Sequence, residues 1–98
     1  MATRRKKAIT FYERAVKLDL NFTLAWARLS GAHAFVYLAR IDATSARRDA
    51  AKRALENAQK LQPHFPETVL ALAHYQYRVL RDYRVAKSTL ALVSNATR

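Results

Sequence analysis

The chain has 98 residues and carries 18 lysines and arginines against 7 aspartates and glutamates, a formal net charge of +11. It contains no cysteine, which excludes disulfides and thiolate catalysis. No apolar run approaches the roughly 20 residues that a membrane-spanning helix needs. Because 51% of the residues are hydrophobic while glycine and proline are scarce, the composition predicts one small all-α domain. We expect a cytoplasmic protein.

The N-terminal residues 1–7 include four consecutive basic side chains, and no hydrophobic segment of a secretory leader follows them. They predict a basic tail ahead of a single helical domain that covers 8–98. Within the chain, the spacing of apolar side chains predicts five helices. Their expected bounds, in chain order, are 6–18, 22 or 23 to 40, from the turn at 41–45 to 61, 67–80 and 83–93.

The segments between these helices contain typical turn and capping residues. Asn21 and Thr23 are expected to cap the second helix, and the polar residues of 41–45 are expected to cap the third. Both prolines fall within 62–66, which is the clearest break in the chain. Connections this short predict that neighbouring helices run antiparallel.

A small–large–small pattern, spaced by four and then three residues, occurs three times in the chain. It is formed by Ala8, Tyr12 and Ala15, by Ala51, Leu55 and Ala58, and by Ala86, Leu90 and Val93. This spacing puts all three side chains on one helix face, where alanine lets a neighbouring helix approach closely. The recurrence predicts stacked helical units.

With this spacing the chain resembles the tetratricopeptide repeat family, and also helical repeat regions of bacterial regulatory proteins. The matching positions are Trp26, Leu29, Ser30 and His33 in one unit, followed by Pro63, and Leu70, Ala73, His74 and Tyr77 in the next. The resemblance implies a right-handed superhelical stack of antiparallel helix pairs. It divides the domain into a half repeat (8–20), a long repeat (21–63) and a further repeat (64–98).

Two departures from the family pattern lead to further expectations. The middle unit is about nine residues longer than the usual period, which should lengthen both of its helices by about one turn. His74 stands where the family usually has a glycine at a helix crossing, and it would widen that crossing.

In such stacks the first helix of each pair lines a concave surface that binds partners. The resemblance therefore implies a protein-interaction scaffold, part of a larger protein, that holds a peptide or helix in this groove. Tyr75 and Arg78 are its expected polar anchors, although Phe35 and Tyr75 could equally pack inside the array. The expected groove residues are Leu24, Ala27, Gly31, Phe35, Thr68, Ala71, Tyr75 and Arg78.

The positive charge supports a second hypothesis, in which the chain is a basic helical adaptor for nucleic acid. Its candidate contacts are Arg47, Arg48, Lys52 and Arg53. His33 and His74 lack further metal ligands, and no nucleophile stands beside a base, so we expect no metal, no cofactor and no enzymatic activity. The stack lacks polar end caps, which predicts self-association through its exposed ends.

Overall fold

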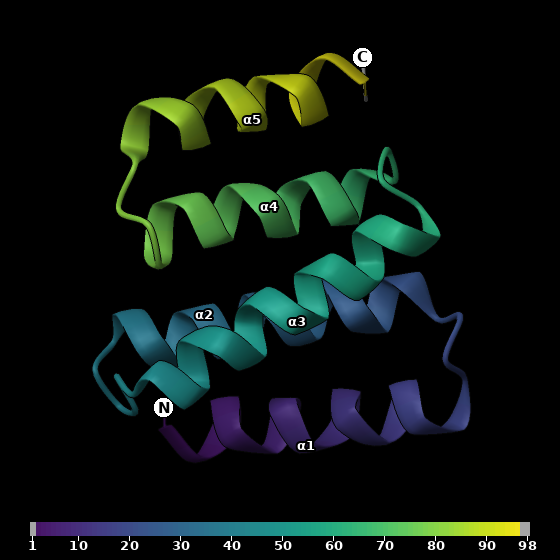
Figure 1. Cartoon of the computed structure of the whole chain (residues 1–98), viewed down its shortest axis with the longest axis vertical. Helices are drawn as coiled ribbons and strands as arrows, with labels where there is room; N and C mark the ends of the chain where they lie inside the picture. Colours follow the sequence, from purple (N-terminus) through teal and green to yellow (C-terminus); the bar gives the residue numbers. More distant parts are fainter. Residues whose placement is uncertain (1, 97–98) are drawn as a thin grey trace.

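Five helices and no strand make up residues 2–96, the part of the chain that the computed structural model describes; its side chains are described for 6–93. The helices are α1 (Ala2–Leu18), α2 (Thr23–Leu38), α3 (Ser45–Leu61), α4 (Pro66–Arg78) and α5 (Tyr83–Ala96) (Figure 1). The all-α prediction is confirmed. The Cα radius of gyration is 12.8 Å, close to the roughly 13 Å of a compact domain of about 100 residues.

The helices pack in an open order, with α2 at the centre. α2 lies against α1, α3 and α4, whereas the described backbone of α1 lies against α2 alone and that of α5 against α4 alone. Figure 1 shows α1 at the bottom of the view and α5 at the top, with the other helices between them. The extents of 34 × 30 × 21 Å describe a slab about two helix diameters thick.

The first helix begins at Ala2, four residues earlier than predicted. The basic run 4–7 therefore lies on α1, and the expectation of a separate tail over 1–7 was wrong for its described residues. Alanine, arginine and lysine are good helix formers, and no glycine or proline interrupts this segment.

The N-terminal caps follow the prediction for α3 but not for α2. Thr44 caps α3, because its Oγ1 accepts a hydrogen bond from the backbone N–H of Arg47 at 3.2 Å. Phe22 occupies the cap position of α2 and makes no side-chain cap bond. The predicted capping by Asn21 and Thr23 is thus incorrect, and the Asn21 N–H is instead bonded to Asp19 Oδ1 at 3.0 Å.

The helices α2 and α4 each end two residues before their predicted ends, at Leu38 and Arg78. Shortly after each end an arginine takes up the left-handed conformation, with φ of 61° at Arg40 and 59° at Arg81. This conformation reverses the chain direction and is normally adopted by glycine. A sequence with arginine at both positions gave no signal of these reversals.

Within the described residues, the helices of the predicted middle unit are longer than the two that follow them. α2 and α3 have 16 and 17 residues, whereas α4 and α5 have 13 and 14. α2 is therefore three residues longer than α4, and α3 is three residues longer than α5. This difference is close to one helical turn.

The crossing of α2 with α3 depends on two small residues that the repeat pattern singled out. Ser30 and Ala51 are both 0% exposed, and the Ser30 hydroxyl donates a hydrogen bond to the Ala51 carbonyl oxygen at 2.8 Å. The close contact leaves no room for a larger side chain at either position.

In the pair formed by α4 and α5, the small residue at the helix crossing lies one position earlier in α4 than predicted. Ala73, which is 1% exposed, is the small buried residue of α4, and Thr89 of α5 donates to Gln76 Oε1 at 2.6 Å. His74 lines an open cavity instead, so it does not widen the crossing. The predicted equivalence of Trp26 and Leu70 is likewise wrong, since Trp26 packs against buried clusters and Leu70 borders the cavity.

The core is thin and rich in alanine. The largest cluster joins α1, α2 and α3, and its members include Ile9 and Val16 of α1, Leu29 and Val36 of α2, and Ala54 of α3. Further clusters link α2 and α3 to α4 through alanines. Among the described helices, none combines the length and hydropathy required to cross a bilayer.

Candidate functional site

Three helices, α1, α2 and α4, surround an open cavity of about 260 Å³. We call this cavity the groove. α2 supplies its floor, and α1 and α4 supply its walls. The lining residues are Ala8 and Tyr12 of α1, Ala27, Arg28, Gly31 and Ala32 of α2, and Glu67, Leu70, Ala71, His74 and Arg78 of α4.

Small side chains keep the floor of the groove low. Ala27 and Gly31 lie on one face of α2, because residues four apart share a side of a helix, and Ala32 borders the cavity next to Gly31. A Cβ atom on Gly31 would lie 3.5 Å from His74 Nδ1, which is ordinary van der Waals contact. Glycine therefore deepens the groove by one methyl group, and the backbone does not require it.

Arg78 of α4 contacts α2 at one end of the groove. Its Nη1 donates a hydrogen bond to the Gly31 carbonyl oxygen at 3.1 Å, and its guanidinium carbon lies 5.5 Å from the centroid of the Phe35 ring. These contacts fix the cation in place. Glu67 lies at the opposite end of α4, about 16 Å away along the helix axis.

His74 is a neutral group in the wall of the groove. Burial, with the nearby charge of Arg78 as a second cause, lowers the pKa of His74 from 6.5 to about 4. At neutral pH the imidazole therefore offers one hydrogen-bond donor and one acceptor without a positive charge.

Four of the eight predicted groove residues line the groove: Ala27, Gly31, Ala71 and Arg78. The other four lie elsewhere, and two of them give a clear correction. Thr68 is 1% exposed and is inaccessible to a partner. Leu24 is half-buried outside the lining, and Phe35 lies under the Arg78 guanidinium.

Tyr75 is the second clear correction, because it faces α3. It packs against the cluster that contains Leu55 and Ala58. The pKa of Tyr75 is raised, first by burial and also by charges on α3 that include Asp49 and Glu56. The alternative in which Tyr75 packs inside the array is therefore the one that the structure supports.

Sequence reasoning missed five larger groove residues: Tyr12, Arg28, Glu67, Leu70 and His74. On α4 the signal was available, since positions 67, 70, 71, 74 and 78 follow the spacing of one helix face. The prediction chose positions mostly one residue further along α4. Such a shift selects a helix face that is rotated by about 100°. The contribution of Tyr12 depends on α1 packing beside α2, and no local pattern reveals it.

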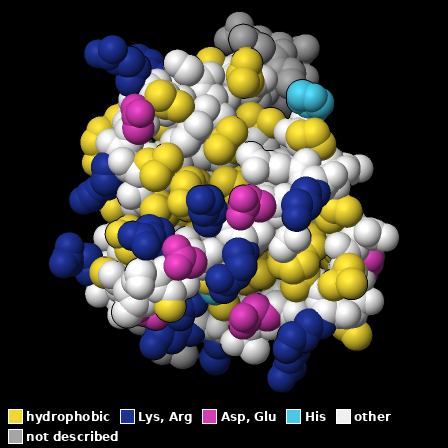
Figure 2. Space-filling model, in the orientation of Figure 1, with side chains coloured by type: hydrophobic (Ala, Val, Ile, Leu, Met, Phe, Trp, Pro, Cys, Tyr) yellow, Lys and Arg dark blue, Asp and Glu magenta, His cyan; other side chains and the backbone are white. Residues whose placement is uncertain are grey.

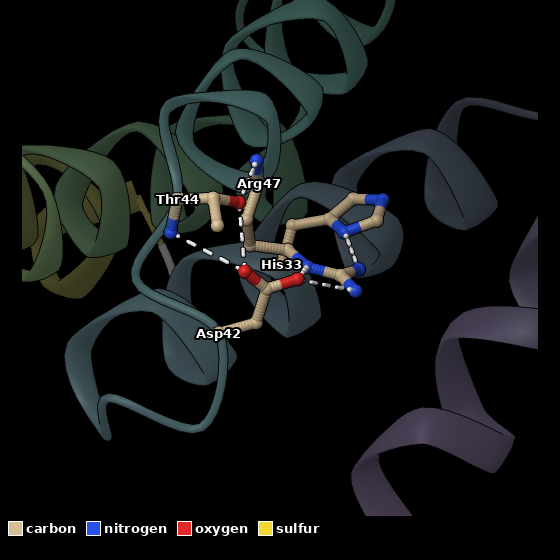
Figure 3. Close-up of polar contacts among 4 residues, drawn as sticks. All are labelled: His33, Asp42, Thr44 and Arg47. Carbon is tan, nitrogen blue, oxygen red and sulfur yellow. Dashed lines mark hydrogen bonds and ion pairs between the residues drawn. The ribbon is translucent and has the colours of Figure 1, made fainter.

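A hydrogen-bonded network joins α2, the following turn and α3 outside the groove (Figure 3). Arg47 donates from Nη1 to His33 Nδ1 at 2.8 Å and from Nε to Asp42 Oδ2 at 3.2 Å. Thr44 Oγ1 donates to Asp42 Oδ1 at 2.7 Å, a bond that helps to lower the pKa of Asp42. The Arg47 side chain is thereby tied to two residues of its own chain, His33 and Asp42.

His33 is the buried member of this network, with 5% exposure. Burial, followed by the charges of Arg47 and Arg53, lowers the pKa of His33 from 6.5 to about 4. The geometry agrees, because Nδ1 can accept a hydrogen bond from a guanidinium only when it carries no proton.

The predicted basic ridge on α3 is divided by these contacts. Arg47 belongs to the network, and Arg48 forms an ion pair with Asp49 at 3.5 Å. Lys52 and Arg53 remain exposed. Figure 2 shows basic side chains interspersed with acidic and hydrophobic ones over this face.

His33 and His74 do not come together, since one contacts Arg47 and the other borders the groove. Within the described part of the chain, no group of three potential metal-ligating side chains forms. Comparison with family models, curated proteins and solved structures finds no match to this chain.

Proposed function

We propose that this protein is an interaction module of tetratricopeptide type, which holds a segment of another protein in the groove. The observation that carries the proposal is the open groove itself, with a low floor and both cationic and apolar walls. A stack of helix pairs presents such a surface on the first helices of its pairs. The open packing order and the small residues at the α2–α3 crossing support this arrangement.

The size of the groove favours a peptide segment over a small-molecule cofactor. Its volume of about 260 Å³ lies below the roughly 300–1,000 Å³ that is typical of small-molecule sites. A groove of this size accommodates one or two side chains of a longer segment, whose remainder would lie along α2 and α4.

The groove chemistry suggests which side chains these are. Tyr12 and Leu70 offer apolar contacts, whereas Arg28 and Arg78 offer guanidinium groups. We therefore expect a partner segment with an apolar side chain next to an acidic one. His74 has a pKa of about 4 and is a weak base, which supports binding in preference to catalysis.

Selection from a displayed library of random peptides tests this function. Peptides that bind the unaltered protein should be rich in acidic and apolar residues. Arg28→Glu reverses an exposed charge in the groove and should weaken their binding at least tenfold, by about 1.4 kcal/mol or more. Titration calorimetry with a synthetic selected peptide measures the effect.

Arg53→Glu makes the same charge change on an exposed residue of α3 and serves as the control. It should leave the affinity unchanged. Equal losses in both variants would attribute binding to overall charge, and no enrichment of peptides at all would contradict the proposal.

The alternative function, nucleic-acid binding, is favoured by the exposed cations of α1. Lys6, Lys7 and Arg14 border a second surface cavity beside the exposed Phe11 ring. Electrophoretic mobility of a labelled oligonucleotide at low and moderate salt tests it, because phosphate contacts weaken as salt rises. Partner capture that resists nuclease treatment would favour the protein partner.

Self-association through the ends of the slab is a further part of this proposal. Phe11 and Leu18 are exposed on α1, and Leu90 and Leu92 are exposed on α5. Because each end lacks a covering helix among the described residues, copies of the chain could bury these side chains against each other. Sedimentation that shows a monomer at high protein concentration would contradict this expectation.

A further inference from the structure

Three arginines converge where α2 and α4 end. Arg40, Arg78 and Arg81 line a cavity of about 350 Å³, together with Tyr37, Leu38, Ala43 and Val79. No acidic side chain belongs to this lining among the described residues. We call this cavity the arginine pocket.

The two nearest aspartates in the sequence are occupied elsewhere. Asp42 accepts hydrogen bonds from Thr44 and Arg47. Asp82 accepts from the backbone N–H of Val85 at 3.2 Å, which caps the start of α5. Neither aspartate belongs to the lining of the arginine pocket.

The carbonyl groups at the helix ends also have partners from the backbone. The Phe35 and Val36 carbonyl oxygens accept from the N–H groups of Ala39 and Asp42. In α4 the Tyr75 and Gln76 oxygens accept from backbone N–H groups in the same way. These carbonyl oxygens therefore do not need a guanidinium group as a cap, which is the usual structural role of a cation at a helix C-terminus.

The backbone brings all three guanidinium-bearing residues to the same place. Arg40 and Arg81 occupy the left-handed conformation, which is uncommon for arginine. Arg78 is held by its hydrogen bond to the Gly31 carbonyl oxygen. Arg40 and Arg81 add two positive charges at the cavity that Arg78 also borders, and these charges would attract an anion.

We propose that the arginine pocket binds a phosphate group. Guanidinium groups present pairs of N–H donors that match two oxygens of a phosphate, and several of them together suit a doubly charged oxyanion better than a single carboxylate. Tyr37 belongs to the same lining and packs against the cluster of Ala34, Ala51 and Val79. Arg78 borders both this pocket and the groove, but Arg40 and Arg81 belong to the pocket alone.

Nuclear magnetic resonance titration of the full ¹⁵N-labelled chain with inorganic phosphate tests the proposal. Saturable shifts are expected at the backbone amides of residues 37–43 and 78–81. The double variant Arg40→Ala, Arg81→Ala should bind phosphate at least about tenfold more weakly. Its circular dichroism and melting curve establish that it folds.

The matched control is the double variant Arg53→Ala, Arg84→Ala, which removes the same charge from exposed positions outside the pocket. It should keep the affinity of the unaltered protein. Equal weakening in both double variants, or shifts that sodium chloride reproduces at the same ionic strength, would overturn the proposal.

A second titration with glycerol 3-phosphate distinguishes the source of the phosphate group. Tighter binding of this organic phosphate would identify the ligand as a phosphate monoester, whereas equal or weaker binding would identify free phosphate. The readout does not depend on any peptide partner, so failure here would leave the proposed function of the groove unaffected.

Discussion

Buried polar side chains show most directly how individual residues stabilise this thin protein. Ser30, His33 and Thr89 are buried, and each has a hydrogen-bond partner on the neighbouring helix. Thr68 is the exception, because its buried Oγ1 has no hydrogen-bond partner in the structure. A buried hydroxyl without a partner costs roughly 1–3 kcal/mol.

Replacement of Thr68 by valine, which has nearly the same shape, should therefore stabilise the protein. We expect the free energy of unfolding to rise by about 1 kcal/mol, which corresponds to roughly 4–8 °C in melting temperature for a domain of this size. Thermal unfolding followed by circular dichroism measures the change. Thr10→Val, on the exposed face of α1, should alter stability by less than about 0.5 kcal/mol. A destabilised Thr68→Val variant would show that the hydroxyl has a partner.

At the scale of the elements, the contacts between α2 and α3 carry most of the specific interactions. The Ser30–Ala51 crossing holds the middle of the pair, and the Arg47 network joins α3 to both α2 and the intervening turn. A single substitution can disturb the Ser30–Ala51 crossing, and a change of pH can protonate His33 in the Arg47 network.

Acidification should weaken the pair through His33. Its pKa is about 4 in the folded protein and 6.5 in the reference state, so between these values the unfolded chain binds a proton that the folded chain does not. Stability is therefore complete above about pH 6.5 and falls as the pH drops towards 4, by on the order of 3 kcal/mol. Protonation of His74 lowers the stability in the same direction, because the pKa of His74 is also lowered to about 4.

Urea unfolding between pH 4 and pH 7 measures this dependence. His33→Gln should make the slope of stability against pH shallower, because one of the two contributing groups is removed. His64→Gln replaces an exposed histidine between α3 and α4 and is the control. A slope that His33→Gln does not change would contradict the role of this residue.

The crossing itself should tolerate no larger side chain. Ala51→Leu inserts three carbon atoms against Ser30, and we expect a loss of about 2 kcal/mol or more. Ala46→Leu makes the same change on the exposed side of α3 and should have little effect. Chemical denaturation of the two variants compares them, and similar stabilities would show that α2 and α3 are less closely packed at this point.

For the whole molecule, the open packing order predicts unequal local stability. α2 contacts three helices, whereas α1 and α5 each lie against one. Helices at the ends of a stack can unfold without disrupting its centre. Hydrogen exchange followed by nuclear magnetic resonance should therefore show the slowest amides in α2 and faster exchange in α1 and α5. Equal protection in all five helices would indicate a fully cooperative unit.

Agreement between the sequence-based predictions and the structure depends on the range of the interactions involved. Helix existence and type were predicted correctly, because apolar periodicity and the two prolines are local signals. The positions of Thr68 and Tyr75 were predicted incorrectly, because the rotation of α4 is set by its contacts with α2 and α3. The reversals at Arg40 and Arg81 were not predicted either, since arginine has no local preference for that conformation.

Local amino-acid preferences suffice to predict five helices, their approximate positions in the chain, and the alanine and serine at the α2–α3 crossing. These properties follow from backbone propensity and side-chain size, which act within one or two turns. The side of each helix that is left open follows instead from how the helices pack together. The groove and the arginine pocket exist because helices distant in the chain pack at particular rotations, and packing free energy is summed over many neighbours.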